Sequence, residues 1–116
     1  MVRAKKRAPI YLWTGLGWGK TTSALGAALR SVGHGYKVII IQFMKGRSDA
    51  IGEYRIRERL SPEYEIHQFG RTGWINLNKP AARDKKIAEE GLRFAMAAAR
   101  KKPFILFLDE IVLAVA

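Results

Sequence analysis

A glycine-rich segment near the N-terminus carries the residue types that bind a triphosphate. It reads Thr14-Gly15-Leu16-Gly17-Trp18-Gly19-Lys20-Thr21-Thr22. Glycines allow backbone N–H groups to converge on an anion, and a following helix adds unpaired N–H groups and the positive end of its dipole. In such a loop the lysine contacts the terminal phosphates and the next hydroxyl ligates Mg²⁺. We therefore predict that residues 14–22 bind a nucleotide, with Lys20 as a candidate catalytic residue and Thr21 as a metal ligand.

The segment departs from the strict phosphate-loop pattern, in which a glycine, any four residues and Gly-Lys-Ser/Thr follow one another. Thr14 occupies the position of the first glycine, and Gly15 comes one place late. The plain alternative is a glycine-rich turn that binds nothing. An apolar run before the turn (10–13) and a helical pattern after it favour the phosphate loop, because the motif requires a strand and a helix there.

Two acidic residues, Asp109 and Glu110, follow the apolar run Phe104–Leu108. Acids at the end of a buried strand are common as solvated strand ends. In one α/β chain with a phosphate loop, however, they fit the second element that anchors magnesium. The candidate metal ligands are therefore Thr21, Asp109 and Glu110, for Mg²⁺ or Mn²⁺, and Glu110 is also a candidate catalytic residue.

The elements that must position these residues alternate between strands and helices. Apolar or β-branched runs predict strands at 10–13, 37–43, 64–69 and 104–108, and helical spacing predicts helices at 21–32, 51–60 and 80–100. This alternation predicts an α/β fold of the P-loop NTPase type, a parallel sheet flanked by helices. Ligands in such sheets bind beyond the carboxyl ends of the strands, where both motifs would lie.

Local patterns give further expectations. The strands at 37–43 and 104–108 lack alternation and are expected to be fully buried. The first helix should bury the apolar stripe Ala24, Leu25, Ala28, Leu29 and Val32 and end at Gly33-His34-Gly35. The longest helix should bury Ile87, Leu92, Phe94, Ala95, Ala98 and Ala99, with Gly91 as an internal weak point of about 1 kcal/mol.

The two histidines are ordinary by position. His34 lies in the turn after the first helix, and a turn residue is expected there rather than a ligand. His67 lies within the predicted strand 64–69, where it is expected to be satisfied by neighbouring residues, with contact to a ligand as the alternative.

Composition bounds the class of protein. The 116 residues suit one domain, with residues 1–9 as a basic N-terminal tail and 10–116 as a nucleotide-binding domain that is expected to be truncated at its C-terminal end. Because there are no cysteines, disulfides and zinc–thiolate sites are excluded. No run approaches the ~20 apolar residues of a membrane span, and no signal-peptide pattern is present, so we expect a cytoplasmic protein.

At the residues above the chain resembles the P-loop ATP:corrinoid adenosyltransferases, which make adenosylcobalamin. That family has threonine where other phosphate loops carry their first glycine. The similarity continues through Ala24–Gly26, Gly33–Gly35, the Gln42–Gly46 segment, Gly52-Glu53, Gly70–Trp74, Glu90–Leu92 and Leu108–Ile111. The shifted loop together with Gln-Phe-x-Lys-Gly is specific to the family, whereas the acidic pair alone is not.

The resemblance implies transfer of the 5′-deoxyadenosyl group of ATP to a reduced Co(I) corrinoid, with release of triphosphate, in adenosylcobalamin biosynthesis or salvage. It implies a homodimer, a reducing flavoprotein as partner, and an aromatic loop over the corrinoid, for which Trp74 is the best match. Trp74 packed against the core is the equally weighted alternative. Two departures, Trp18 for a lysine and Val112 for an asparagine, remove polar groups near the phosphate loop and the acidic pair.

Two other functions fit parts of the sequence. The first is a small P-loop ATPase or kinase-like protein, in which Glu110 activates water or orients a hydroxyl. The second is a basic nucleic-acid-binding module with an ATP switch, suggested by the net charge of +11. No RNA-recognition signature or zinc finger accompanies that charge, so nucleic acid is not the expected partner.

Overall fold

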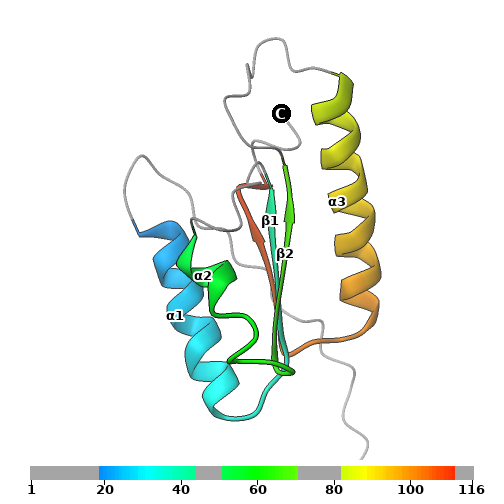
Figure 1. Ribbon diagram of the computed structural model, residues 1–116. Helices are drawn as coiled ribbons and strands as arrows, with labels where there is room; N and C mark the ends of the chain where they lie inside the picture. Colours follow the sequence, from blue (N-terminus) through cyan, green and yellow to red (C-terminus); the bar gives the residue numbers. More distant parts are fainter. Residues whose placement is uncertain (1–18, 44–50, 71–81, 112–116) are drawn as a thin grey trace, which may run out of the picture.

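A parallel sheet with helices on both faces forms the centre of the computed structural model, which describes residues 19–43, 51–70 and 82–111 (Figure 1). The elements in chain order are α1 (Lys20–Gly33), β1 (Val38–Phe43), α2 (Gly52–Arg55), β2 (Tyr64–Phe69), α3 (Ala82–Arg100) and β3 (Ile105–Asp109). The predicted α/β fold with a parallel sheet flanked by helices is confirmed. The predicted strand at 10–13 lies outside the described residues.

The centre of the sheet is β1, which pairs in parallel with β2 on one side and β3 on the other. All six of its residues are buried. A β-branched run without alternation is what a strand covered on both faces requires, because neither face meets water. The prediction of a fully buried strand at 37–43 is confirmed for Val38–Phe43.

Alternation along the strands divides the side chains between two cores. Val38 and Ile40 of β1, with the residues beside them in β2 and β3, pack against α1 and α2. Ile39, Ile41 and Phe43 pack against α3. Figure 1 shows this arrangement, with α1 and α2 on one side of the sheet and α3 on the other. Each strand residue is therefore assigned to a face by its parity and register.

The helix α1 ends where the sequence predicts. His34 caps it, and Gly35 follows with a φ of 79°, a left-handed conformation that glycine adopts without strain. Ala28 is fully buried, and Leu25 and Val32 pack against the same core. Leu29 is 59% exposed, so its place in the predicted stripe was wrong. It lies about 100° around the helix from Ala28, which already faces the sheet.

The helix predicted at 51–60 is much shorter in the structure. Only Gly52–Arg55 is helical, and hydrogen-bonded turns continue to the start of β2. The Tyr54 carbonyl accepts from the Arg57 backbone N–H at 3.3 Å and from Arg57 Nη1 at 2.9 Å. The Tyr54 carbonyl is thus occupied by Arg57 instead of accepting from the N–H four residues later, as it would in a continued α-helix. The Arg57 guanidinium also stacks on the Tyr54 ring at 3.9 Å.

The strand β3 is less buried than its apolar run predicts. Its residues are half-buried, and Leu108 is 38% exposed. Within the described ranges β3 has a strand partner only in β1, so one of its edges lacks the cover that β1 has on both sides. The expectation of a fully buried strand at 104–108 was therefore wrong.

The contact surface of α3 differs in part from the predicted one. Ala95 and Ala98 are buried and Leu92 and Phe94 pack on them, but Ala99 is exposed. Gly91, predicted as a weak point, is a point of close approach. A Cβ atom there would lie 2.7 Å from Phe43 Cε1 and 2.9 Å from Phe69 Cγ. Glycine at this position lets α3 rest directly on the two phenylalanine rings.

Replacement of Gly91 by alanine should lower the free energy of unfolding by about 1–2 kcal/mol, although alanine is the better helix former, because the added methyl overpacks the core. Gly26→Ala is the matched control, since a Cβ at Gly26 meets no atom within 4 Å. That variant should gain up to about 1 kcal/mol. Urea denaturation of both variants measures the difference, and stabilisation of the two by equal amounts would contradict the close approach.

Candidate functional site

The carboxyl ends of the three strands place polar side chains in one row. Gln68, Gln42 and Asp109 are neighbours in the register, with Gln42 between the other two. Each lies two positions after a strand residue that packs on the α1 side: Ile66, Ile40 and Phe107, respectively. Because side chains alternate along a strand, all three members of the row lie on the face that α1 covers. We call Gln68, Gln42 and Asp109 the polar row.

The N-terminus of α1 meets this row at Asp109. The Thr21 hydroxyl lies 3.1 Å from Asp109 Oδ1 and 3.2 Å from Oδ2. These two residues are 88 positions apart in the chain. The fold therefore brings the end of the glycine-rich segment and the acidic strand end into direct contact.

The start of α1 has features that favour an anion. Gly19 precedes the helix with φ 101° and ψ −3°, a left-handed conformation that glycine favours. Among the described residues no side chain caps the helix, and its first turn holds no acidic residue. Lys20, half-buried, is its first residue. The N–H groups of a helix's first turn and the helix dipole favour an anion at such a position.

Two acids flank the amide of Gln42. Its Nε2 donates to Glu53 Oε2 at 3.1 Å and to Asp109 Oδ2 at 3.4 Å, while its carbonyl accepts from Gln68 Nε2 at 2.9 Å. No role was predicted from the sequence for Gln42, Glu53 or Gln68. One pattern could have indicated the two glutamines: the strands at 37–43 and 64–69 each carry a glutamine one residue before their end.

Glu53 reaches the row because α2 is fixed to the sheet. The Tyr64 hydroxyl donates to the Glu53 backbone carbonyl at 2.7 Å. Burial, reinforced by the nearby charge of Glu53, raises the pKa of Tyr64 to about 12. The phenol therefore stays a neutral donor and keeps α2 in place well above neutral pH.

Glu110 follows Asp109 with a left-handed backbone, φ 63°. The residue is half-buried, and its carboxylate takes no part in the hydrogen bonds of the polar row among the described residues. The predicted roles of Glu110 as catalytic residue and metal ligand stay predictions.

The oxygen donors at this site fit Mg²⁺. Thr21 and Asp109 offer a hydroxyl and a carboxylate within 3.2 Å of each other, and Mg²⁺ typically takes one or two carboxylates together with substrate phosphates and water. Across residues 19–43, 51–70 and 82–111 no group of three or more His, Cys, Asp or Glu side chains could hold a metal ion.

Several predicted site residues lie outside the described residues: Thr14, Gly15, Leu16, Gly17 and Trp18 of the loop, the corrinoid-facing candidate Trp74, and Val112. Of the predicted nucleotide-binding residues, the structure describes Gly19, Lys20, Thr21 and Thr22. These four form the start of α1 and the residue before it.

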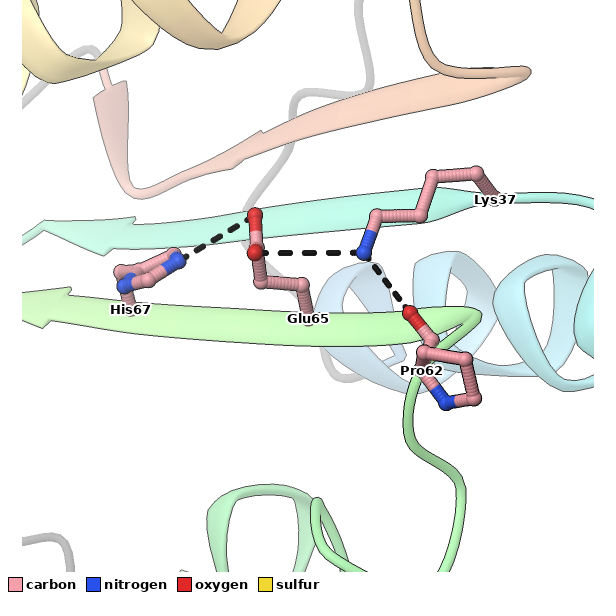
Figure 2. A network of polar contacts seen from close by, with 4 residues as sticks. All are labelled: Lys37, Pro62, Glu65 and His67. Carbon is pink, nitrogen blue, oxygen red and sulfur yellow. Dashed lines mark hydrogen bonds and ion pairs between the residues drawn. The ribbon is translucent and has the colours of Figure 1, made fainter.

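His67 lies on the opposite face of the sheet from the polar row. Figure 2 shows it beside Glu65 and Lys37: its Nε2 is 3.3 Å from Glu65 Oε2, and Lys37 Nζ is 3.8 Å from Glu65 Oε1. Lys37 also donates to the Pro62 carbonyl at 2.7 Å. The His67 ring packs on Phe94 of α3 at 4.3 Å. The expectation of a satisfied strand residue is not confirmed, because the buried Nε2 of His67 has no hydrogen-bond partner among the described residues in spite of its approach to Glu65. Exposed His34 is a turn residue as predicted.

The parallel sheet, the helix that starts directly after Gly19 and the acidic end of β3 are consistent with the P-loop NTPase type of α/β fold. Residues 6–116 match the family model of the ATP:corrinoid adenosyltransferases BtuR/CobO/CobP. The chain therefore belongs to this family, as the resemblance predicted.

Similar proteins carry the same description. The chain is 42% identical over 74 residues to a corrinoid adenosyltransferase of Escherichia coli K12 and 40% identical over 77 residues to corrinoid adenosyltransferase CobA of Salmonella typhimurium. A corrinoid adenosyltransferase of Pseudomonas aeruginosa is 33% identical over 90 residues. The matches cover 64%, 66% and 78% of this chain but 37%, 38% and 43% of the relatives.

No solved structure gives a significant match. Within the part of the chain that the structure describes, no helix is long and apolar enough to cross a membrane.

Replacement of Thr21 by valine should weaken ATP binding in the presence of Mg²⁺ by about tenfold or more, because it removes the hydroxyl that contacts Asp109 and keeps the side-chain shape. Thr22→Val is the matched control, since Thr22 is exposed on the next position of the helix. Calorimetric titration with ATP and Mg²⁺ makes the comparison. Equal affinity of the Thr21 variant and the unmodified protein would remove Thr21 from the metal site.

Tyr64 should make the protein less stable as the pH rises from about 10 to about 12. Below this window both states keep the phenolic proton. Within it the unfolded chain loses the proton at a pKa of about 10 while the folded protein keeps it, so the free energy of unfolding falls. In Tyr64→Phe the fall should be smaller, on top of a constant loss of about 0.5–1.5 kcal/mol for the missing hydrogen bond. Denaturation curves across this window test the slope, and identical slopes would refute it.

Proposed function

We propose that the protein transfers the 5′-deoxyadenosyl group of ATP to a reduced Co(I) corrinoid and releases triphosphate. Membership of the ATP:corrinoid adenosyltransferase family supports the reaction class, as do the names of the similar proteins. The observation that carries the proposal at the residue level is the contact of Thr21 with Asp109, at 3.1 and 3.2 Å. It joins a phosphate-binding helix start to a carboxylate at the edge of the sheet where ligands bind.

The reaction requires alignment and charge neutralisation rather than a base. The electron pair of Co(I) attacks the ribose 5′ carbon, the bond from that carbon to oxygen breaks, and its electron pair leaves with triphosphate. Because the nucleophile carries no proton, no residue has to remove one. The protein must hold the two reactants in line and stabilise the negative charge that grows on the leaving oxygen.

The charges and dipoles at the start of α1 suit that second task. Lys20 and the uncapped N–H groups of the first turn would bind the triphosphate, together with the loop residues from Thr14 to Trp18. Mg²⁺ or Mn²⁺, held by Thr21 and Asp109 with Glu110 nearby, would neutralise part of the triphosphate charge. The oxygen donors present fit such an ion.

The remaining parts of the proposal concern the second substrate and the partners. The segment around Trp74 would cover the lower face of the corrinoid, where loss of an axial ligand makes cobalt easier to reduce. A flavoprotein would supply the electron, and two copies of the chain would form a homodimer. These roles come from the family resemblance.

Incubation with ATP, Mg²⁺ and a chemically reduced corrinoid should form a light-sensitive cobalt–carbon bond and release triphosphate in equal amount. Absorbance before and after illumination measures the bond, and chromatography of the nucleotides measures the leaving group. ADP and phosphate as the only products would overturn the proposal in favour of a hydrolase or kinase. In that case Glu110→Gln should abolish ADP formation while ATP stays bound.

A further inference from the structure

Gln42 is the most deeply buried polar side chain in the described part of the chain. It is 0% exposed at the end of a strand whose other residues are all apolar. Burying an amide is costly unless its groups are hydrogen-bonded. Gln42 makes three such bonds, two of them to the carboxylates of Glu53 and Asp109. An apolar residue would fill this position at lower cost, so the amide has a role that packing alone does not explain.

The orientation of the Gln42 amide follows from the chemistry of its neighbours. Ionised carboxylates only accept hydrogen bonds, so the end that faces Glu53 and Asp109 must be the NH₂ group. The carbonyl end is fixed by Gln68, whose Nε2 donates to it at 2.9 Å. One NH₂ group thus supplies a hydrogen to each of two carboxylates that belong to different elements, α2 and β3.

We propose that Gln42 is a positioning residue that orients the Asp109 carboxylate toward the cation bound with ATP. Gln42 Nε2 donates to Asp109 Oδ2, and the Thr21 hydroxyl contacts both oxygens of the same carboxylate. Through Glu53 the same amide ties α2 to this arrangement. The inference rests on the proposed binding of ATP with a divalent cation at the start of α1. Gln42 would act on that cation only through the orientation of the Asp109 carboxylate.

The first test replaces Gln42 by methionine, which has similar length and no hydrogen-bonding group. Loss of an outer partner of a metal ligand typically costs about 10–100-fold in metal affinity. We therefore expect the affinity for Mn²⁺ in the presence of saturating ATP to fall at least about tenfold, while the affinity for ATP without metal changes by less than about twofold. Electron paramagnetic resonance of free Mn²⁺ and calorimetry measure the two quantities.

Gln68→Met is the matched control. It makes the same replacement at the neighbouring register position and, among the described residues, removes only the bond to the Gln42 carbonyl. Its effect on Mn²⁺ affinity should be clearly smaller than that of Gln42→Met. Equal losses in the two variants would mean that the row acts through packing, and would overturn the proposal.

Gln42→Asn provides a second measurement that does not depend on the methionine variant folding. Asparagine keeps the amide but is one methylene shorter, so its NH₂ group no longer reaches Asp109, which Gln42 Nε2 contacts at 3.4 Å. The Mn²⁺ affinity with ATP should therefore fall at least about tenfold, as in Gln42→Met. An affinity equal to that of the unmodified protein would contradict the positioning role.

The outcomes separate this inference from the proposed function. Unchanged Mn²⁺ affinity in Gln42→Met, or an equal loss of metal-free ATP binding, overturns the positioning role and leaves adenosyl transfer untouched. Metal-dependent ATP binding that Gln42→Met weakens as expected, in a protein that forms no cobalt–carbon bond, supports the positioning role and removes adenosyl transfer. Absence of metal-dependent ATP binding in the unmodified protein overturns both.

Discussion

The complete burial of β1 is the constraint on which the site depends. This strand has a parallel neighbour on each edge and helices on each face, so its backbone is paired and its side chains are packed on all sides. If β2 or β3 slipped by one residue against β1, the apolar side chains of the slipped strand would point to the wrong face of the sheet. The register is therefore fixed, and with it the position of the strand ends. Gln42 and Asp109 are neighbours at the carboxyl edge because the preceding residues of β1, Val38 to Ile41, pair in register with β3.

The alternation of side chains that builds the two cores also decides on which face of the sheet the polar side chains of the site lie. Ile40 and Phe107 bury their side chains toward α1, so the next residues of the same parity, Gln42 and Asp109, also point that way. There they meet Thr21 at the start of α1. On the opposite face the corresponding positions of β1 are apolar and rest on α3, where Gly91 allows close contact with Phe43. One face holds α3 in place, and the other presents polar groups.

The sequence allowed the strands at 37–43, 64–69 and 104–108, the first helix and the meeting of the two motifs to be predicted, because each is a local pattern or follows from parallel topology. Runs such as Val38–Phe43 define strands, and carboxyl ends of parallel strands share an edge. The polar row was missed because Gln68 and Gln42 become neighbours only through register, which separate runs do not reveal. Gly91 looked like a weak helix position because propensity is local, whereas its contact with Phe43 is tertiary. Similarly, the hydrogen bonds of Arg57 shorten α2 against its apolar spacing.

The acidic pair at the end of β3 lies where the regular alternation of the strand stops. Continued alternation would send the Glu110 side chain toward α3, on the face opposite to Asp109. The left-handed backbone at Glu110, φ 63°, ends the alternation directly after Asp109. For a residue with a Cβ this conformation costs about 1 kcal/mol or more, so the surrounding structure must stabilise it. Two successive residues in regular β-structure point to opposite faces of the sheet. The end of the alternation at Glu110 is therefore what the proposed binding of one cation by both acids would require.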